Sequence, residues 1–460
     1  MSLPELSLLG IAITIIYTSQ GSYGITEPLQ AALGFSLIGF ISTNYLIPKL
    51  SSSFIKIGLY GKDLSKPNKP VIPESLGSVA ATSYLFVMFF FIPFLFIKYL
   101  VTNTTGGGNR DDGITQIRDS DLDRFPHDKL AGYLSAILCL ESTVLLGIAD
   151  DLFDIRWRHK FFLPAIAAIP LLIVYYVDFG ITHVLIPKFL ESWFPQGQTT
   201  IELGWLYYIY MSSVAIFCPN SINILAGVNG LEVGQSIIIA LLILINDLIF
   251  LVSGSFPARE SHLFSICLII PFLGVSLALL KFNWWPSKVF VGDTYCYFAG
   301  MVFAIVGILG HFSKTLLLFF IPQIFNFIYS LPQLINSIPC PRHRLPKFNP
   351  EDGLMYPSMV DYTQPTTKQL KPWITQTLEL LSILKLVKLE KDIKTGRIIK
   401  NSNFTLINLI LVWFGPLRED KLTLIILGLQ FLIGVFAIFI RHTIGPWVFG
   451  YDNLWLTNII

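Results

Sequence analysis

Residues 234–252 read GQSIIIALLILINDLIFLV, a run of mostly apolar side chains in which Asp247 is the only charged residue. About 20 consecutive apolar residues are long enough to cross the hydrocarbon core of a bilayer as a helix. A helix satisfies its own backbone hydrogen bonds, which lipid cannot do for it. This stretch therefore predicts a membrane-spanning helix and sets the fold class.

Runs of the same kind recur through the 460 residues and predict about ten transmembrane helices. The composition agrees, because 53% of the residues are hydrophobic and only 13% are charged, well below the charged share of soluble proteins. This balance excludes a soluble multidomain enzyme and a disordered protein, and the net charge of +2 argues against nucleic-acid binding. The expected spans are about 30–50, 76–100, 130–149, 161–177, 203–219, 234–252, 263–282, 295–310, 315–336 and 421–440.

The chain divides into three predicted parts. Residues 1–336 hold nine spans, residues 337–420 form an insertion, and residues 421–460 hold the last span and a tail. Within the insertion, residues 373–387 are expected to form an amphipathic helix, and residues 388–400 a hairpin around Thr395 and Gly396. The predicted fold is an all-α polytopic membrane protein with a small mixed α/β insertion before the last helix.

The distribution of Lys and Arg predicts the orientation, because cytosolic loops are enriched in these residues. One alternating set of loops carries 20 Lys and Arg and the other set carries 8, although the long insertion supplies the whole excess. The richer set consists of loops 51–75, 150–160, 220–233, 283–294 and 337–420. We expect this set in the cytosol and both termini in the lumen.

An acidic cluster ends the third predicted span. Asp150 and Asp154 share one helix face, and Asp151 lies about a quarter-turn away. Carboxylates grouped in this way repel one another unless a cation lies among them, and Arg156 and Lys160 follow closely. The cluster alone does not decide between a catalytic site and an ordinary charged helix end.

Three further polar clusters interrupt the apolar sequence: Pro219–Gly230, Asn283–Thr294 and Pro339–Pro346. Taken singly, they also fit a connecting turn, a helix cap and a basic membrane anchor. Alternation through ten spans, however, puts all of them on one membrane face with the acidic cluster. Carboxylates, amides and guanidinium groups at one mouth suit a diphosphate with Mg²⁺ or Mn²⁺. A nucleotide-sugar transporter would need polar groups spread toward both faces, and a structural scaffold would need none of them.

Together these motifs resemble the polyprenyl-phosphate N-acetylhexosamine-1-phosphate transferase superfamily from about residue 57 to residue 346. The eukaryotic branch is the nearer one, because Arg342-His343-Arg344 stands where the bacterial branch has a His-rich motif. The matching strings are Ala149–Asp151, Arg156–Lys160, Asn223–Glu232, Phe290–Thr294, Gly310–Thr315 and Pro339–Arg344.

The resemblance implies a role for each matched residue. It assigns catalysis to Asp150, Asp151 and Lys160, and Mg²⁺ binding, with Mn²⁺ as the alternative, to Asn223 and Asp293. It assigns Trp157 to the lipid side. It assigns binding of UDP-GlcNAc to Glu74, Gly227, Asn229, Phe290, Arg342, His343 and Arg344.

The implied reaction transfers GlcNAc-1-phosphate from UDP-GlcNAc to dolichyl phosphate, giving dolichyl-diphosphate-GlcNAc and UMP. This is the first step of the lipid-linked oligosaccharide pathway for protein N-glycosylation, with residues 1–336 as the catalytic core. The expected location is the endoplasmic reticulum membrane, with the active site facing the cytosol. Beyond the two substrates and membrane lipid, a homodimer or a complex with next-step glycosyltransferases is the expected assembly.

Overall fold

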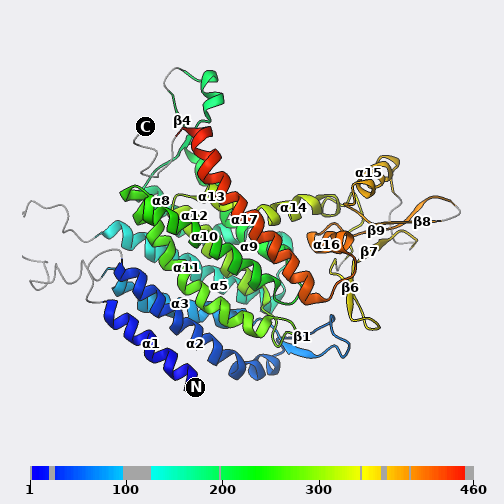
Figure 1. Ribbon diagram of the computed structural model, residues 1–460, viewed down its shortest axis with the longest axis horizontal. Coiled ribbons are helices and arrows are strands. Elements are labelled where there is room, and N and C mark those ends of the chain that lie inside the picture. Colours follow the sequence, from blue (N-terminus) through cyan, green and yellow to red (C-terminus); the bar gives the residue numbers. More distant parts are fainter. Residues whose placement is uncertain are drawn as a thin grey trace, which may run out of the picture.

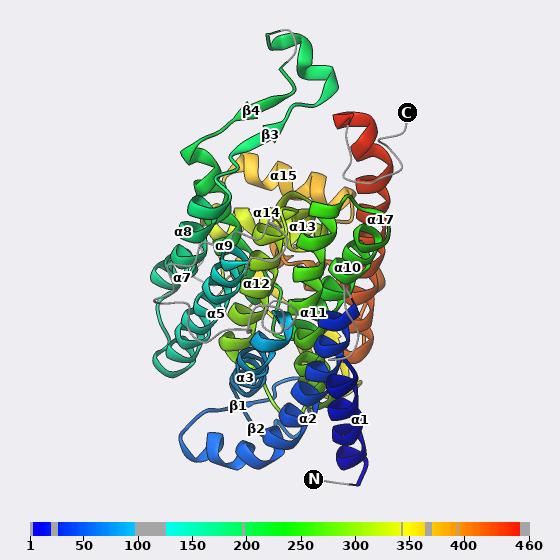
Figure 2. The same ribbon diagram turned by 90° about the vertical axis from the view of Figure 1, so that its left-hand side faces the viewer.

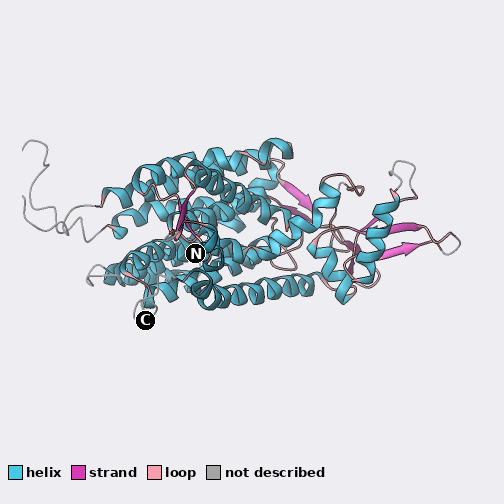
Figure 3. Cartoon of the chain, turned by 90° about the horizontal axis from the view of Figure 1, so that it is seen from above, coloured by secondary structure: helices cyan, strands magenta, loops and turns pink. Residues whose placement is uncertain are grey.

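The computed structural model describes residues 3–19, 26–96, 126–195, 198–341, 344–363, 370–392 and 395–450. Long helices lie side by side in a bundle, and a smaller part that contains strands extends from one end (Figure 1). Seen from above, most strands gather at that end (Figure 3). The predicted all-α polytopic class is confirmed.

Seven described helices are long and apolar enough to cross a membrane, and a pair bent by 69° at Phe320 passes the same test when counted as one. The bent pair is α13 (Ser313–Phe319) and α14 (Ile321–Leu334). The seven are α2 (Thr26–Lys56), α3 (Gly77–Leu95), α5 (His127–Phe153), α10 (Leu231–Ser253), α11 (Phe256–Asn283), α12 (Gly292–Leu309) and α17 (Glu419–Phe449).

The other two predicted spans fall on helices that do not meet this test. Residues 161–177 correspond to two short helices, α7 (Leu163–Ala167) and α8 (Ile169–Asp178). Residues 203–219 fall on α9 (Trp205–Ile224), whose tyrosine, serine and asparagine side chains make it less apolar. Length and composition therefore support seven or eight of the ten predicted spans.

Helix α12 forms the centre of the bundle, where α3, α5, α9 and α11 surround it (Figure 2). All its residues from Thr294 to Leu309 are buried. Small residues let the helices approach closely: a Cβ at Gly300 would lie 2.3 Å from the Pro219 backbone, and one at Gly147 would lie 2.6 Å from Thr294. This packing fixes the position of the first turn of α12, where the candidate site lies.

The part at the end of the bundle has the predicted mixed character. Helix α15 (Pro372–Ile383) and the hairpin with Gly396 at φ +67° lie where the sequence predicts them. The elements of the insertion are β5 (Lys347–Asn349), β6 (Leu354–Tyr356), β7 (Met359–Asp361), β8 (Leu389–Lys391), β9 (Ile398–Ser402) and α16 (Leu406–Phe414), with β7, β8 and β9 in the order β7-β9-β8.

Two further small sheets connect helices. The antiparallel pair β1 (Tyr60–Lys62) and β2 (Val71–Pro73) joins α2 to α3 near the insertion. At the opposite end of the bundle, β3 (His183–Leu185) pairs with β4 (Thr200–Glu202), and a short 3₁₀ helix, η2 (Lys188–Trp193), lies between them.

The placement of both termini in the lumen stays a prediction, and the structure adds the directions of the first and last described helices. The apolar N-terminal run forms a separate helix, α1 (Leu3–Ser19), antiparallel to α2. Glu5 in its first turn accepts a hydrogen bond from Asn44 at 2.6 Å, and Asn44 in turn accepts one from Lys281, near the end of α11 that leads to the candidate site. Helix α1 therefore begins toward the site end of the bundle, whereas α17 ends at the opposite end.

Candidate active site

A reversal of the chain after α5 builds the first part of the site. Asp154 caps α5 in the left-handed region at φ +48°, and its N–H donates to the Asp150 carbonyl. The Ile155 N–H then donates to Oδ1 of Asp150 at 3.1 Å. This turn sends the chain back toward the bundle, so that the last residue of α6 (Trp157–Lys160) reaches Asp150.

Lys160 joins two carboxylates from different helices. Its Nζ lies 2.8 Å from Oδ2 of Asp150 and 2.7 Å from Oδ2 of Asp293, on the first turn of α12. Burial alone would lower the pKa of Lys160, but the charges of Asp293 and Asp150 outweigh burial and raise that pKa. Lys160 is therefore a cation at neutral pH, and its charge holds the two carboxylates together.

Asp151 makes different contacts from its neighbour. Its Oδ1 accepts from the Asp293 N–H at 2.7 Å, and its Oδ2 accepts from the Thr294 hydroxyl at 2.6 Å. These bonds satisfy the start of α12, where helix N–H groups have no partner within the helix. Gly292 permits the approach, because its φ is +74° and a Cβ would lie 2.7 Å from the Asp151 carboxylate. Asp151 thus fixes the helix that carries Asp293.

Asn223 brings a neutral amide to the same cluster. It lies near the end of α9, and its side chain lies close to the Asp293 carboxylate. Among the described residues, no three His, Cys, Asp or Glu side chains are grouped closely enough to hold a metal ion. Mg²⁺ needs no such cage, because one or two protein oxygens plus substrate phosphates and water usually complete its shell. Asp293 and Asn223 offer these oxygens and therefore fit the predicted ion.

Glu74 and Phe290 come together at the edge of the cluster. The Phe290 N–H donates to the carbonyl of Pro73, the last residue of β2, at 2.8 Å. Its ring packs on Gly61 in β1, where a Cβ would lie 3.0 Å from the ring and 3.4 Å from Oε2 of Glu74. Glu74 is exposed as a whole residue, but its carboxyl group is partly removed from water. This loss of water is the largest cause that raises the pKa of Glu74, and the charges of Asp151 and Asp293 raise it further.

A glycine loop and the start of the insertion form another wall. Gly227, at φ +95°, donates its N–H to Oε1 of buried Glu232 at 2.7 Å, and Leu345 packs where a Cβ would lie. The carbonyl of the adjacent Arg344 accepts from the Asn408 amide at 2.7 Å. Nη1 of Arg344 is buried and has no hydrogen-bond partner among the described residues. A guanidinium nitrogen of this kind is available to a phosphate oxygen.

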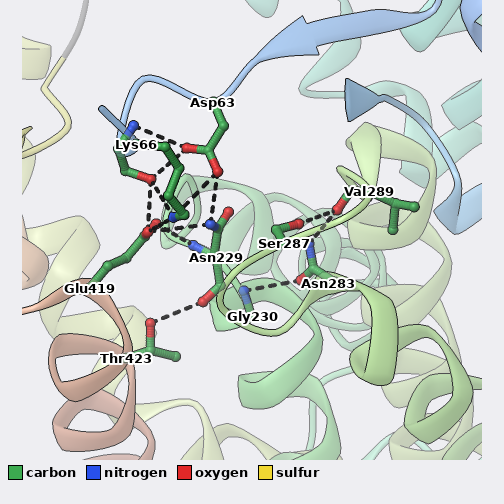
Figure 4. Close-up of polar contacts among 10 residues, drawn as sticks. Asp63, Lys66, Asn229, Gly230, Asn283, Ser287, Val289, Glu419 and Thr423 are labelled. Atoms are coloured by element: carbon green, nitrogen blue, oxygen red, sulfur yellow. Dashed lines mark hydrogen bonds and ion pairs between the residues drawn. The ribbon is translucent and has the colours of Figure 1, made fainter. Parts of the chain in front are cut away.

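Asn229 lies in a distinct polar cluster (Figure 4). Its Nδ2 is 3.1 Å from Oδ2 of Asp63 and 3.3 Å from Oε2 of Glu419, and only 4% of the residue is exposed. Two carboxylates therefore engage its amide nitrogen. The predicted contacts of Arg342 and His343 lie outside the described residues, as does the Trp157 side chain.

An apolar cavity of about 280 Å³ begins one residue beyond Lys160. Phe161 lines it, and its carbonyl accepts a hydrogen bond from Asn220 at 3.2 Å. Ser213 and Phe217 of α9 and Gln323 of α14 also line it. A charged cluster thus adjoins an apolar recess, which suits a ligand with a charged head and a hydrocarbon tail.

Two buried carboxylates beside the site, Glu232 and Glu419, are not among the residues predicted from the sequence. Each lies in the first turn of a helix. Acidic residues are common there because they complement the helix dipole, so the sequence offers an ordinary explanation for both. The one available signal is that Glu232 is the last residue of the matched string Asn223–Glu232.

Comparison with known proteins gives a consistent set of relatives. A family model described as glycosyl transferase family 4 matches residues 133–311. The chain is 62% identical over 448 residues to the UDP-N-acetylglucosamine–dolichyl-phosphate N-acetylglucosaminephosphotransferase of Saccharomyces cerevisiae, covering 97% of this chain and 98% of the relative. Identity to the proteins of the same name is 52% in Schizosaccharomyces pombe, covering 93% and 95%, and 39% in Dictyostelium discoideum, covering 89% and 88%.

Proposed function

The chain belongs to the glycosyl transferase family 4, and we propose that it catalyses the reaction named for its relatives, transfer of GlcNAc-1-phosphate from UDP-GlcNAc to dolichyl phosphate. The products are dolichyl-diphosphate-GlcNAc and UMP. It is a phosphotransferase embedded in the membrane by several helices. One observation supports the chemistry above all: Lys160, Asp150 and Asp293 meet directly beside an apolar cavity.

The cavity and the charged cluster suit the two ends of the acceptor. The prenyl tail would occupy the recess lined by Phe161 and Phe217, and its phosphate would then reach the Lys160 ammonium. Dolichyl phosphate is ionised near neutral pH, so its oxygen can attack the sugar-linked phosphorus without a strong general base or a protein nucleophile. The bond to UMP breaks as the new P–O bond forms, and the displacement depends mainly on alignment and charge stabilisation.

Each residue of the cluster has a separate role in the proposed reaction. Lys160 supplies positive charge where negative charge builds up on the transferred phosphoryl group. Asp150 holds Lys160, and Asp151 fixes the start of α12 and thereby Asp293. When bound by Asp293 and Asn223, Mg²⁺ would neutralise the donor diphosphate.

The donor would lie across the walls of the site. Arg344, with its unpartnered Nη1, would contact a phosphate, and Phe290 would stack on the uracil. Glu74 would contact the nucleoside, and Gly227 and Asn229 would approach the base. These roles rest on the matched motifs and agree with the adjacency of Phe290, Gly61 and Glu74.

We further propose that the enzyme resides in the endoplasmic reticulum membrane with this site facing the cytosol. The support is the excess of Lys and Arg in the loops that form the site end, all of which comes from the insertion. UDP-GlcNAc in the cytosol would then reach the site without crossing the bilayer.

The proposed function is tested with purified enzyme, UDP-GlcNAc labelled on the sugar, dolichyl phosphate and Mg²⁺. Label should enter the lipid fraction with release of UMP, and omission of dolichyl phosphate or Mg²⁺ should stop it. Asp293→Ala should abolish transfer while leaving the protein folded, as judged by its elution as a single species. Label that crosses sealed vesicles unchanged would instead show a transporter, and near-normal transfer by Asp293→Ala would contradict the metal role.

A further inference from the structure

A buried network of charges connects α17 to two loops beside the active site, and the mechanism above does not use its carboxylates (Figure 4). Glu419 in the first turn of α17 is 4% exposed, and Asp63 after β1 is 3% exposed. Oε2 of Glu419 lies 2.6 Å from Nζ of Lys66 and 2.7 Å from the Ser65 hydroxyl. Carboxylates are costly to bury unless they are paired, so these contacts are a condition for both side chains to lie there.

The same network fixes Asn229 from several directions. Oε1 of Glu419 accepts from its backbone N–H at 3.0 Å, and Oε2 lies 3.3 Å from its Nδ2. Thr423, one turn later in α17, donates to its carbonyl at 3.1 Å, and Asp63 accepts from Nδ2 at 3.1 Å. The peptide and the amide of Asn229 are thus held by the first turns of α17 and by the loop after β1.

Both loops in the network lead into the active site. Asp63 is two residues beyond Gly61, which packs against the Phe290 ring. Asn229 is two residues beyond Gly227, whose loop packs on the start of the insertion. A change in the separation of residues 60–66 and 227–230 would therefore move two walls of the site relative to each other.

We propose that Glu419 is a positioning residue for the donor nucleotide. Its buried carboxylate sets the separation of residues 60–66 and 227–230, so that the two loops present one surface to UDP-GlcNAc. The inference rests on the proposed function, because it takes the donor to lie between these loops. The network also connects the insertion to the site, because Leu417 lies two residues before Glu419 and pairs with Met355 of β6. The two backbone hydrogen bonds of this pair are 2.7 and 3.3 Å long.

Glu419→Gln tests the proposal in the full-length enzyme. The amide carries no charge to balance the Lys66 ammonium, and it brings an NH₂ group toward the donors of Asn229. We expect the KM for UDP-GlcNAc to rise about tenfold, while kcat and the KM for dolichyl phosphate change by less than about twofold. A merely structural defect would not separate the two substrates in this way.

Asp420→Asn is the matched control, because it removes a carboxylate from the same helical turn. Asp420 pairs with the exposed Arg418 at 2.5 Å. Among the described residues, Asp420 makes no hydrogen bond or ion pair with a member of the buried network. Its KM values should equal those of the wild type. Lys66→Met should raise the donor KM as Glu419→Gln does, and the double variant should show less than the product of the two effects.

An unchanged donor KM in folded Glu419→Gln, or an equal rise in both KM values, would overturn the proposal. If Glu419→Gln does not fold, Thr423→Val replaces it, because this change removes only the bond to the Asn229 carbonyl. A donor KM raised about two- to threefold would then support the proposal, and no rise would overturn it.

A wild-type enzyme that forms no labelled lipid would refute the proposed function instead. Calorimetric titration of UDP-GlcNAc into wild type and Glu419→Gln would still decide the positioning role.

Discussion

Lys160 keeps two carboxylates together, and its replacement by methionine exposes what its charge contributes. Both Oδ2 atoms, of Asp150 and Asp293, lie within hydrogen-bond distance of one nitrogen, so they are at most about 5.5 Å apart. At an effective dielectric constant of about 20, two unit charges at that separation repel by about 3 kcal/mol. Lys160→Met should therefore lose about 3 kcal/mol of stability or more unless a proton or a cation replaces the ammonium.

The same variant should lose catalysis by a larger factor. Removing a cation from the developing charge of a transition state typically costs about 10²–10³ in kcat. The assay measures labelled lipid formed by purified Lys160→Met at saturating concentrations of both substrates. Thermal unfolding with and without Mg²⁺ accompanies it, and Mg²⁺ should stabilise the variant more than the wild type, because two unpaired carboxylates attract the ion.

Lys129→Met is the control for this experiment. Lys129 lies at the other end of α5 and pairs with Glu260 of α11 at 3.0 Å, with both side chains 40% exposed. An exposed pair contributes little, so activity and stability should stay close to the wild type. Transfer by folded Lys160→Met within a few-fold of the wild-type rate would refute the role given to this residue.

Three more changes probe other parts of the site. Gly292→Ala should lower stability by about 1–3 kcal/mol and abolish transfer, because φ is +74° and the new Cβ would strike the Asp151 carboxylate; thermal unfolding and the lipid assay check this. Glu74 has a raised pKa, so its stability contribution is present below its ordinary pKa of 4.5 and is lost as the pH rises through the folded value. Glu74→Gln should therefore unfold at a higher temperature than the wild type at neutral pH, and the difference should vanish below pH 4.5. Ser213→Trp should fill the cavity and raise the KM for dolichyl phosphate without changing the binding of UDP-GlcNAc, which titration of each substrate measures.

The sequence predicts those features that depend on local pattern. The long apolar runs predict the helices, and the Thr395-Gly396 turn predicts the hairpin of the insertion. The motifs also identify Asp150, Lys160 and Asp293, and the structure brings these three into direct contact. They were predictable because the alternation of spans places their clusters on one membrane face and the family resemblance implies their roles.

Features that depend on tertiary contacts could not be predicted in this way. Adjacent Asp150 and Asp151 look equivalent in sequence, yet one holds Lys160 and the other holds the start of α12, because the reversal at Asp154 turns the chain between them and Lys160. The direction of α1 depends on its packing against α2, in which Glu5 contacts Asn44. The roles of Glu419 and Asn229 depend on two loops that meet only in the folded chain.

The opposed directions of α1 and α17 have a practical consequence. Helix α1 starts toward the site end, and α17 starts at Glu419 beside the site and finishes at Phe449 on the far side. Epitope tags fused ahead of Leu3 and beyond Gly450 would accordingly emerge into different compartments. Antibody access in selectively permeabilised cells would then reveal the orientation of the whole bundle without any change to the residues that handle the substrates.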